Sequence, residues 1–192
     1  MVKKILAILA IVSTLIYAQA TQAPKFNLKD INGKVTEVIA KKNGLEIPSA
    51  KGKIVFIEFW GTHCPPCVYS IPHYIELTKK YKDNLEMFAV EAQGTNKEQL
   101  INFAKAKGIN YNLYTQEENI DFVRYLAQRA GWRGAIPFLV ILDTNGDVVD
   151  IKTGMVSQEY LEKIIEYVLN KSKQANNIKD TNTTKQDINS TK

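Results

Sequence analysis

Alternating and continuous apolar runs along the chain predict a series of strands. Residues 23–30 alternate apolar and polar side chains and lead into a turn, after which a second strand is expected near residues 35–39. Residues 53–60 form a nearly continuous apolar run, which is typical of a strand buried on both faces. Two further strands are expected at residues 136–142 and 147–151, around a hairpin turn.

The remaining segments predict one more strand, over residues 85–92, and helices between the strands. A helix begins at Pro65, and Pro72 within it should kink it. Thr95 opens a capping box for the next helix, which ends at a glycine, and Ser157 caps the last one. A further helix is expected over residues 118–130. Strands alternating with helices predict an α/β sandwich of three layers.

Both ends of the chain differ from its body. Two lysines, an apolar run and small residues predict a signal peptide over residues 1–20, cleaved after Ala20, and therefore export to the periplasm. A retained membrane anchor is the alternative, although the run is shorter than the roughly 20 residues that span a bilayer. Residues 171–192 are rich in Lys, Asn, Thr, Asp and Gln, which predicts a disordered polar tail. The folded domain is expected at residues 21–170.

Charge excludes one class of partner. The 192 residues carry a net charge of +5, from 25 Lys and Arg against 20 Asp and Glu. Residues 21–170, however, hold 18 basic and 18 acidic side chains, because the excess lies in the two ends. The expected domain is neutral, so nothing in its charge favours nucleic acid.

The chain contains two cysteines, Cys64 and Cys67. A disulfide between them would close only two intervening residues and would constrain the unfolded chain little, so chemistry explains the pair better than stability does. They lie where the buried strand gives way to a helix, and a helix N-terminus favours a thiolate. We expect Cys64 to be the nucleophile and Cys67 to resolve the mixed disulfide.

With these cysteines, the sequence resembles the thioredoxin superfamily, in particular its exported branch of TlpA, ResA and CcmG-type proteins. The resemblance covers about residues 23–170. It rests on an opening motif at 23–34, a central strand at 52–62, the helix proline Pro72, and Ile136-Pro137, which matches the family's cis-proline. It implies a thioredoxin-like three-layer sandwich with an N-terminal β-hairpin extension, working as a thiol:disulfide oxidoreductase without an organic cofactor.

The resemblance also implies roles for residues near the cysteines. Glu58 stands six residues before Cys64, where thioredoxins carry a buried Asp. Apolar neighbours should raise its pKa toward neutrality, which suits a group that takes the proton from Cys67 during resolution. The alternative is an acid that forms an ion pair at the strand end. Ile136 and Pro137 are expected to dock the substrate backbone.

Trp60 and His63 complete the expected substrate-binding residues. His63 replaces the residue that usually precedes the first cysteine of the family. A protonated His63 would stabilise the Cys64 thiolate and make the protein more oxidising. Exposed and neutral, it would instead contact partners, which is the interpretation we favour.

The direction of electron flow follows from the motif's prolines. Neither Pro65 nor Pro66 has an N–H, so a Cys64 thiolate loses two donors and the couple becomes less oxidising. This favours a reductase or isomerase acting on protein thiols and disulfides, and the resemblance suggests a membrane electron donor of the DsbD or CcdA type. ResA-like proteins carry a Glu where Ser70 stands, which weakens the transfer of a role in cytochrome c maturation.

The sequence is also compatible with three other functions. A disulfide-forming oxidase would use the same two cysteines. A copper or zinc protein would use His63, Cys64 and Cys67, with His73 nearby, although Cys67 and His73 point well apart on a helix. A thioredoxin-fold chaperone would not need both cysteines.

The polar tail contains one further motif. Asn182 and Asn189 each lie in a stretch that reads acid-x-Asn-x-Ser/Thr. This resembles the acceptor sequence of bacterial N-linked glycosylation, which needs a flexible and exposed segment. Both asparagines are therefore candidate glycosylation sites.

Overall fold

The computed structural model describes residues 22–189, with side chains described up to residue 175. Its larger sheet has five strands in the order β6-β5-β4-β7-β8. The strands of this sheet are β4 (Ile54–Trp60), β5 (Leu85–Glu91), β6 (Asn112–Thr115), β7 (Phe138–Leu142) and β8 (Val148–Thr153). β4 is parallel to β5 and antiparallel to β7, so it lies at the centre of the sheet.

A second, smaller sheet precedes it. β1 (Lys25–Lys29) and β2 (Val35–Ala40) form the expected antiparallel hairpin. β3 (Leu45–Glu46) pairs with β2, and the short 3-10 helix η1 (Pro48–Ala50) follows. These last two elements lie in a segment whose sequence gives only turn signals.

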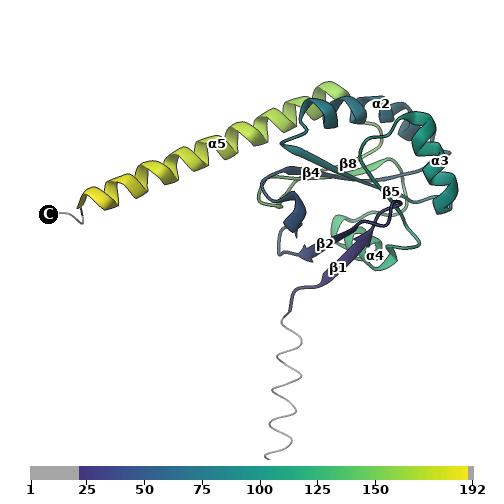
Figure 1. Cartoon of the computed structure of the whole chain (residues 1–192), viewed down its shortest axis with the longest axis horizontal. Helices are drawn as coiled ribbons and strands as arrows, with labels where there is room; N and C mark the ends of the chain where they lie inside the picture. Colours follow the sequence, from purple (N-terminus) through teal and green to yellow (C-terminus); the bar gives the residue numbers. More distant parts are fainter. Residues whose placement is uncertain (1–21, 190–192) are drawn as a thin grey trace, which may run out of the picture.

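The helices cover both faces of the larger sheet (Figure 1). They are α2 (Pro65–Lys80), α3 (Lys97–Lys107), α4 (Ile120–Ala130) and α5 (Gln158–Asn189). Side chains of α2, α3 and α5 pack on one face, whereas α4 and the hairpin pack on the other. The three layers and the N-terminal hairpin confirm the thioredoxin-like α/β sandwich predicted from the sequence.

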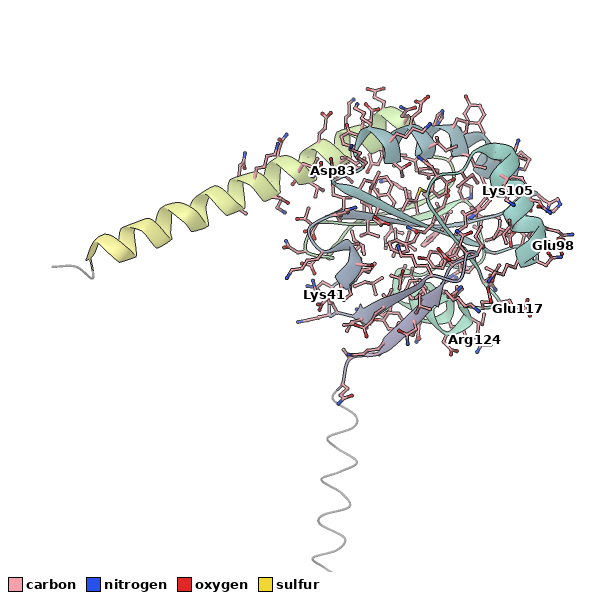
Figure 2. All side chains as sticks on the ribbon, viewed as in Figure 1. Lys41, Asp83, Glu98, Lys105, Glu117 and Arg124 are labelled. Atoms are coloured by element: carbon pink, nitrogen blue, oxygen red, sulfur yellow. A yellow bond between two sulfur atoms is a disulfide. The ribbon has the colours of Figure 1, made fainter. Side chains whose placement is uncertain are left out.

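The central strand shows why its sequence is so apolar. All seven residues of β4 are buried, because both faces of the sheet are covered. Phe56 and Trp60 belong to the core cluster under α2, whereas Val55 and Phe59 belong to the cluster under α4 and the hairpin. Figure 2 shows the side chains that fill the space on the two sides of the sheet. Alternation along the strand places Glu58 on the same face as Phe56 and Trp60.

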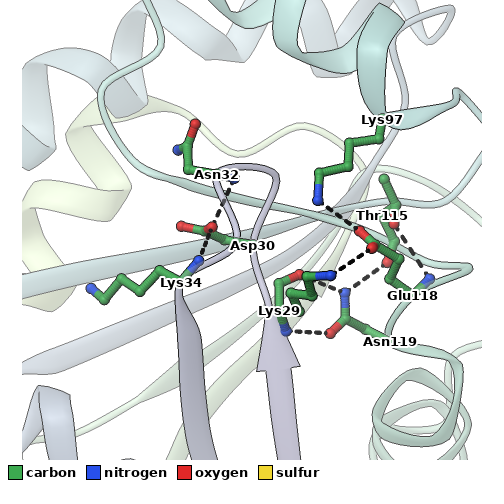
Figure 3. Close-up of polar contacts among 8 residues, drawn as sticks. All are labelled: Lys29, Asp30, Asn32, Lys34, Lys97, Thr115, Glu118 and Asn119. Atoms are coloured by element: carbon green, nitrogen blue, oxygen red, sulfur yellow. Dashed lines mark hydrogen bonds and ion pairs between the residues drawn. The ribbon is translucent and has the colours of Figure 1, made fainter.

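Asn119 ties the hairpin to the domain (Figure 3). Its side chain accepts a hydrogen bond from the Lys29 backbone N–H at 2.9 Å and donates to the Lys29 carbonyl at 3.1 Å. It also donates to the Thr115 carbonyl at the end of β6, at 2.9 Å. Glu118 adds ion pairs to Lys29 and Lys97, each at 3.5 Å. The hairpin is therefore fixed to the loop between β6 and α4.

Three details differ from the predictions. Asn96, not Thr95, caps α3, since its side chain accepts from the Gln99 N–H at 2.9 Å. β6 was not predicted, because four residues give too short a pattern. α5 continues to Asn189, where the sequence predicts a disordered tail from residue 171.

Other predictions concern the chain ends. Ser157 does cap α5, because its Oγ accepts from the Tyr160 N–H. The predicted signal peptide, residues 1–20, lies outside the described residues. Among the helices of the described part, none is long and apolar enough to cross a membrane.

Candidate active site

Cys64 and Cys67 form a disulfide at the start of α2. Cys64 is the N-cap residue, and the backbone N–H of Cys67 donates to its Sγ at 3.4 Å. Pro65 and Pro66 occupy the first two helical positions and have no N–H to offer. Cys64 is 6% exposed and Cys67 is 1% exposed. A partner therefore reaches Cys64 more readily, which fits the predicted order of attack.

Gly61 allows the loop before the disulfide to lie close to Gln93, in the segment that follows β5. A Cβ at this position would lie 2.0 Å from Oε1 of Gln93. That same oxygen accepts a hydrogen bond from the His63 backbone N–H at 2.9 Å. A larger residue would displace Gln93, so the glycine is required for the support that Gln93 gives to the loop.

Glu58 lies in the centre of the sheet, on the face covered by α2. It is 2% exposed, and burial raises its pKa from 4.5 to about 8. A hydrogen bond with Tyr74 opposes this rise. Its Oε1 has no hydrogen-bond partner among the described residues. Glu58 is thus a buried acid that can gain or lose a proton near neutral pH, and no described side chain forms an ion pair with it.

Tyr74 is a site residue that the sequence analysis missed. It lies seven residues after Cys67, and therefore two turns further along the same face of α2. Its ring is 3% exposed and meets Tyr111 edge to face, with 6.3 Å between centroids. Burial raises the Tyr74 pKa well above its usual value, so its hydroxyl remains a donor to Glu58. Helical spacing from the cysteines was the signal that could have identified it.

The Ile136–Pro137 peptide bond is cis, as the resemblance implies. Ile136 is partly buried and packs against the apolar cluster that contains both cysteines. The Pro137 carbonyl accepts from the Gly154 N–H at 2.8 Å and so is fixed to the segment after β8. Trp132 braces the preceding loop, because its Nε1 donates to the Ala135 carbonyl at 2.7 Å.

Trp60 and His63, the two other predicted substrate contacts, differ in exposure to solvent. Trp60 is 1% exposed and packs against Phe103, with 5.7 Å between ring centroids. The end of β4 points into the core beneath α2, so little of the Trp60 ring is accessible, and its contact with substrate stays a prediction. His63 is exposed beside Cys64, as expected, and its Nδ1 lies 3.0 Å from Oγ1 of Thr62.

The structure places the candidate metal ligands and the two candidate glycosylation sites as follows. Within them, no group of three or more His, Cys, Asp or Glu side chains is placed to hold a metal ion. His73 instead meets the edge of the Tyr69 ring, at 5.6 Å between centroids. Asn182 and Asn189 belong to α5, but the structure describes only their backbone and not their side chains.

Ser70 is buried and its hydroxyl donates to the Pro66 carbonyl, one turn back, at 3.0 Å. The helix face after the disulfide therefore carries a buried hydroxyl where ResA-like proteins carry a glutamate. This chain presents no carboxylate at that position.

Known proteins resemble this chain in sequence. The AhpC/TSA family model matches residues 20–151. The thiol-disulfide oxidoreductase ResA of Bacillus thuringiensis is 32% identical over 142 residues, which is 73% of each chain. ResA of Halalkalibacterium halodurans is 29% identical over 150 residues, covering 77% of this chain and 75% of the relative.

Solved structures share the fold. A thiol:disulfide interchange protein of the thioredoxin family from Chlorobium tepidum superposes with a TM-score of 0.61 and 24% identity, over 78% of this chain and 96% of that protein. StoA from Bacillus subtilis gives a TM-score of 0.54 and 19% identity, over 73% and 96%. At these identities the likeness concerns the fold alone.

Proposed function

The chain belongs to the AhpC/TSA family and is a thiol-disulfide oxidoreductase of the ResA and CcmG type, and from that premise we propose that it is a periplasmic reductase or isomerase of protein disulfides. One observation carries the direction. The Cys64 sulfur accepts a hydrogen bond from the Cys67 backbone N–H. Pro65 and Pro66 occupy the two positions between them, where other residues would offer two further backbone N–H donors. A thiolate with fewer donors is less stabilised, so the couple is less oxidising.

The reaction proceeds through a mixed disulfide. The Cys64 thiolate attacks a substrate disulfide, so a bond between Cys64 and one substrate sulfur forms and the other substrate sulfur leaves with the electron pair. Cys67 then gives its proton to Glu58 and attacks the Cys64 sulfur. The Cys64–Cys67 disulfide forms, and the second substrate sulfur leaves as a thiolate that takes up a proton.

Glu58 is the proton acceptor for Cys67 in this proposal. Its pKa of about 8 means that both the ionised and the protonated carboxyl are accessible near neutral pH. The unpaired Oε1 is the atom available for the transfer. Glu58 returns the proton when Cys67 leaves as a thiolate in the reverse reaction.

A reductase in an oxidising compartment must be re-reduced. We propose a membrane donor of the DsbD or CcdA type, with the Ile136–Pro137 segment docking both that donor and the substrates. The N-terminal lysines, apolar run and small residues support export, with cleavage after Ala20. The buried Ser70 gives no support for a role in cytochrome c maturation.

Trapping in the native cell tests this function. A Cys67→Ser variant cannot resolve the mixed disulfide, so it should accumulate covalent adducts with exported proteins and with a membrane thiol donor. A Cys64→Ser variant is the matched control and should capture none. Adducts formed with Cys64→Ser, or a chain that keeps residues 1–20 and stays in the cytoplasm, would overturn the proposal.

A further inference from the structure

A series of side-chain hydrogen bonds connects exposed His63 to buried Glu91. His63 Nδ1 lies 3.0 Å from Thr62 Oγ1, and Thr62 Oγ1 lies 2.7 Å from Thr95 Oγ1. The Thr95 hydroxyl donates to Glu91 Oε1 at 2.8 Å. Glu91 is the last residue of β5 and is 1% exposed. Two hydroxyl groups therefore join the imidazole before Cys64 to a carboxyl in the sheet.

The Glu91 carboxylate accepts hydrogen bonds and therefore fixes which group donates in each hydrogen bond of the series. Glu91 accepts both the Thr95 N–H, at 2.9 Å, and the Thr95 hydroxyl. Because the Thr95 hydrogen is used, its oxygen accepts from the Thr62 hydroxyl, and the Thr62 oxygen in turn accepts from His63. His63 must then carry its hydrogen on Nδ1. This tautomer leaves Nε2 with a free lone pair.

The backbone of His63 is held as well. Gln93 Oε1 accepts its N–H at 2.9 Å, and the absence of a side chain at Gly61 makes room for this contact. The residue is thus fixed through its backbone and through one ring nitrogen, although the side chain is exposed next to Cys64.

We propose that His63 Nε2 takes and returns the proton of the substrate cysteine, and that Thr62, Thr95 and Glu91 are positioning residues that hold the ring for this transfer. The inference rests on disulfide exchange at Cys64 and holds for either direction of the proposed function. It divides the proton transfers between two groups. Glu58 serves Cys67, inside the protein, and His63 serves the substrate sulfur, outside it.

With the oxidised protein, a substrate thiol opens the Cys64–Cys67 disulfide. His63 Nε2 removes the proton of a substrate thiol, and the resulting thiolate attacks Cys64 Sγ. The substrate–Cys64 bond forms, the Cys64–Cys67 bond breaks, and the electron pair leaves on Cys67, which takes a proton from Glu58. In the reverse direction, the His63 imidazolium returns its proton to the substrate thiolate that is expelled.

Two small thiols test this transfer with the oxidised full chain at pH 7. Glutathione is mostly a protonated thiol at this pH and needs a proton acceptor, whereas 5-thio-2-nitrobenzoate is already a thiolate. Thr95→Val and Thr62→Val each interrupt the series at a different hydroxyl. We expect each variant to react with glutathione roughly tenfold more slowly, and with 5-thio-2-nitrobenzoate within about twofold of the original rate.

Two matched variants serve as controls. Thr95→Ser keeps the hydroxyl and should restore the glutathione rate. Thr144→Val removes a threonine hydroxyl whose partner is Ser172, away from the disulfide, and should change neither rate. Equal slowing of both thiols by the valine variants would mean a structural role only and would overturn the inference. Unchanged glutathione rates would overturn it too.

The tautomer gives an independent readout. Nitrogen NMR of His63 should show hydrogen on Nδ1 in the original chain and a shift toward Nε2–H in Thr62→Val. A chain whose His63 already carries its hydrogen on Nε2 would contradict the proposal. These outcomes do not depend on the reduction potential, so a failure here is distinguishable from a wrong direction in the proposed function.

Discussion

The Tyr74 hydroxyl hydrogen-bonds to the Glu58 carboxyl between the sheet and α2, and the two residues are only 3% and 2% exposed. The contact occupies part of the Glu58 carboxyl and leaves Oε1 without a partner among the described residues. Tyr74 therefore orients the acid while leaving one oxygen available. It also stabilises the ionised form of Glu58 against the cost of burial.

Replacing Tyr74 with Phe should raise the Glu58 pKa further above about 8. The hydrogen bond lowers that pKa, so its loss leaves burial as the dominant effect. An NMR titration of the Glu58 carboxyl carbon measures the change. Tyr167→Phe, at an exposed position of α5, should leave the titration unchanged. A Glu58 pKa that falls in Tyr74→Phe would contradict this arrangement.

Replacing Glu58 with Gln should stabilise the oxidised protein at high pH. The folded-state pKa is raised, so between pH 4.5 and about 8 the folded protein binds more protons at Glu58 than the unfolded chain does. Wild-type stability therefore falls as pH rises through this window, and the variant escapes that loss. The difference should reach the order of 2–5 kcal/mol above pH 8.

Urea unfolding of the oxidised protein at pH 5 and pH 8 measures this difference. Glu159→Gln is the matched control, because Glu159 is exposed on α5 and its pKa is lowered by Lys163. Its effect on stability should not grow between the two pH values. A stability difference between Glu58→Gln and the wild type that does not grow from pH 5 to pH 8 would contradict the raised Glu58 pKa.

Replacing Pro66 with Ala should make the disulfide more oxidising. The change supplies an N–H at the second helical position, where it can stabilise a Cys64 thiolate. We expect the reduction potential to rise by roughly 30 mV, the equivalent of about 1.4 kcal/mol. Pro48→Ala, at an exposed position of η1, is the control and should leave the potential unchanged. A lower potential in Pro66→Ala would refute the argument from the prolines.

Local patterns predicted most of the fold. The all-buried β4 followed from its continuous apolar run, and the hairpin followed from alternation around a turn. β6 was missed because Asn112–Thr115 is too short to show a period and depends on pairing with β5. Thr95 was predicted to cap α3 because its hydroxyl is suited to that contact, but Glu91 takes the hydroxyl instead and Asn96 caps the helix.

The site was predictable only in part. The positions of Cys64, Cys67 and Glu58 followed from the motif, because strand and helix place them. The burial of Trp60 did not follow, since the sequence does not show that α2 closes over the end of β4. The contacts from Thr62 to Thr95 and from Gln93 to His63 join residues about thirty positions apart, and no local pattern encodes them.

The reduction potential of the Cys64–Cys67 couple against glutathione tests the central claim most directly. Pro65 and Pro66 offer no N–H to the Cys64 thiolate. A reductase or isomerase built in this way should have a potential closer to the roughly −270 mV of thioredoxin than to the roughly −120 mV of DsbA. A value near that of DsbA would contradict the account and indicate a disulfide-forming oxidase.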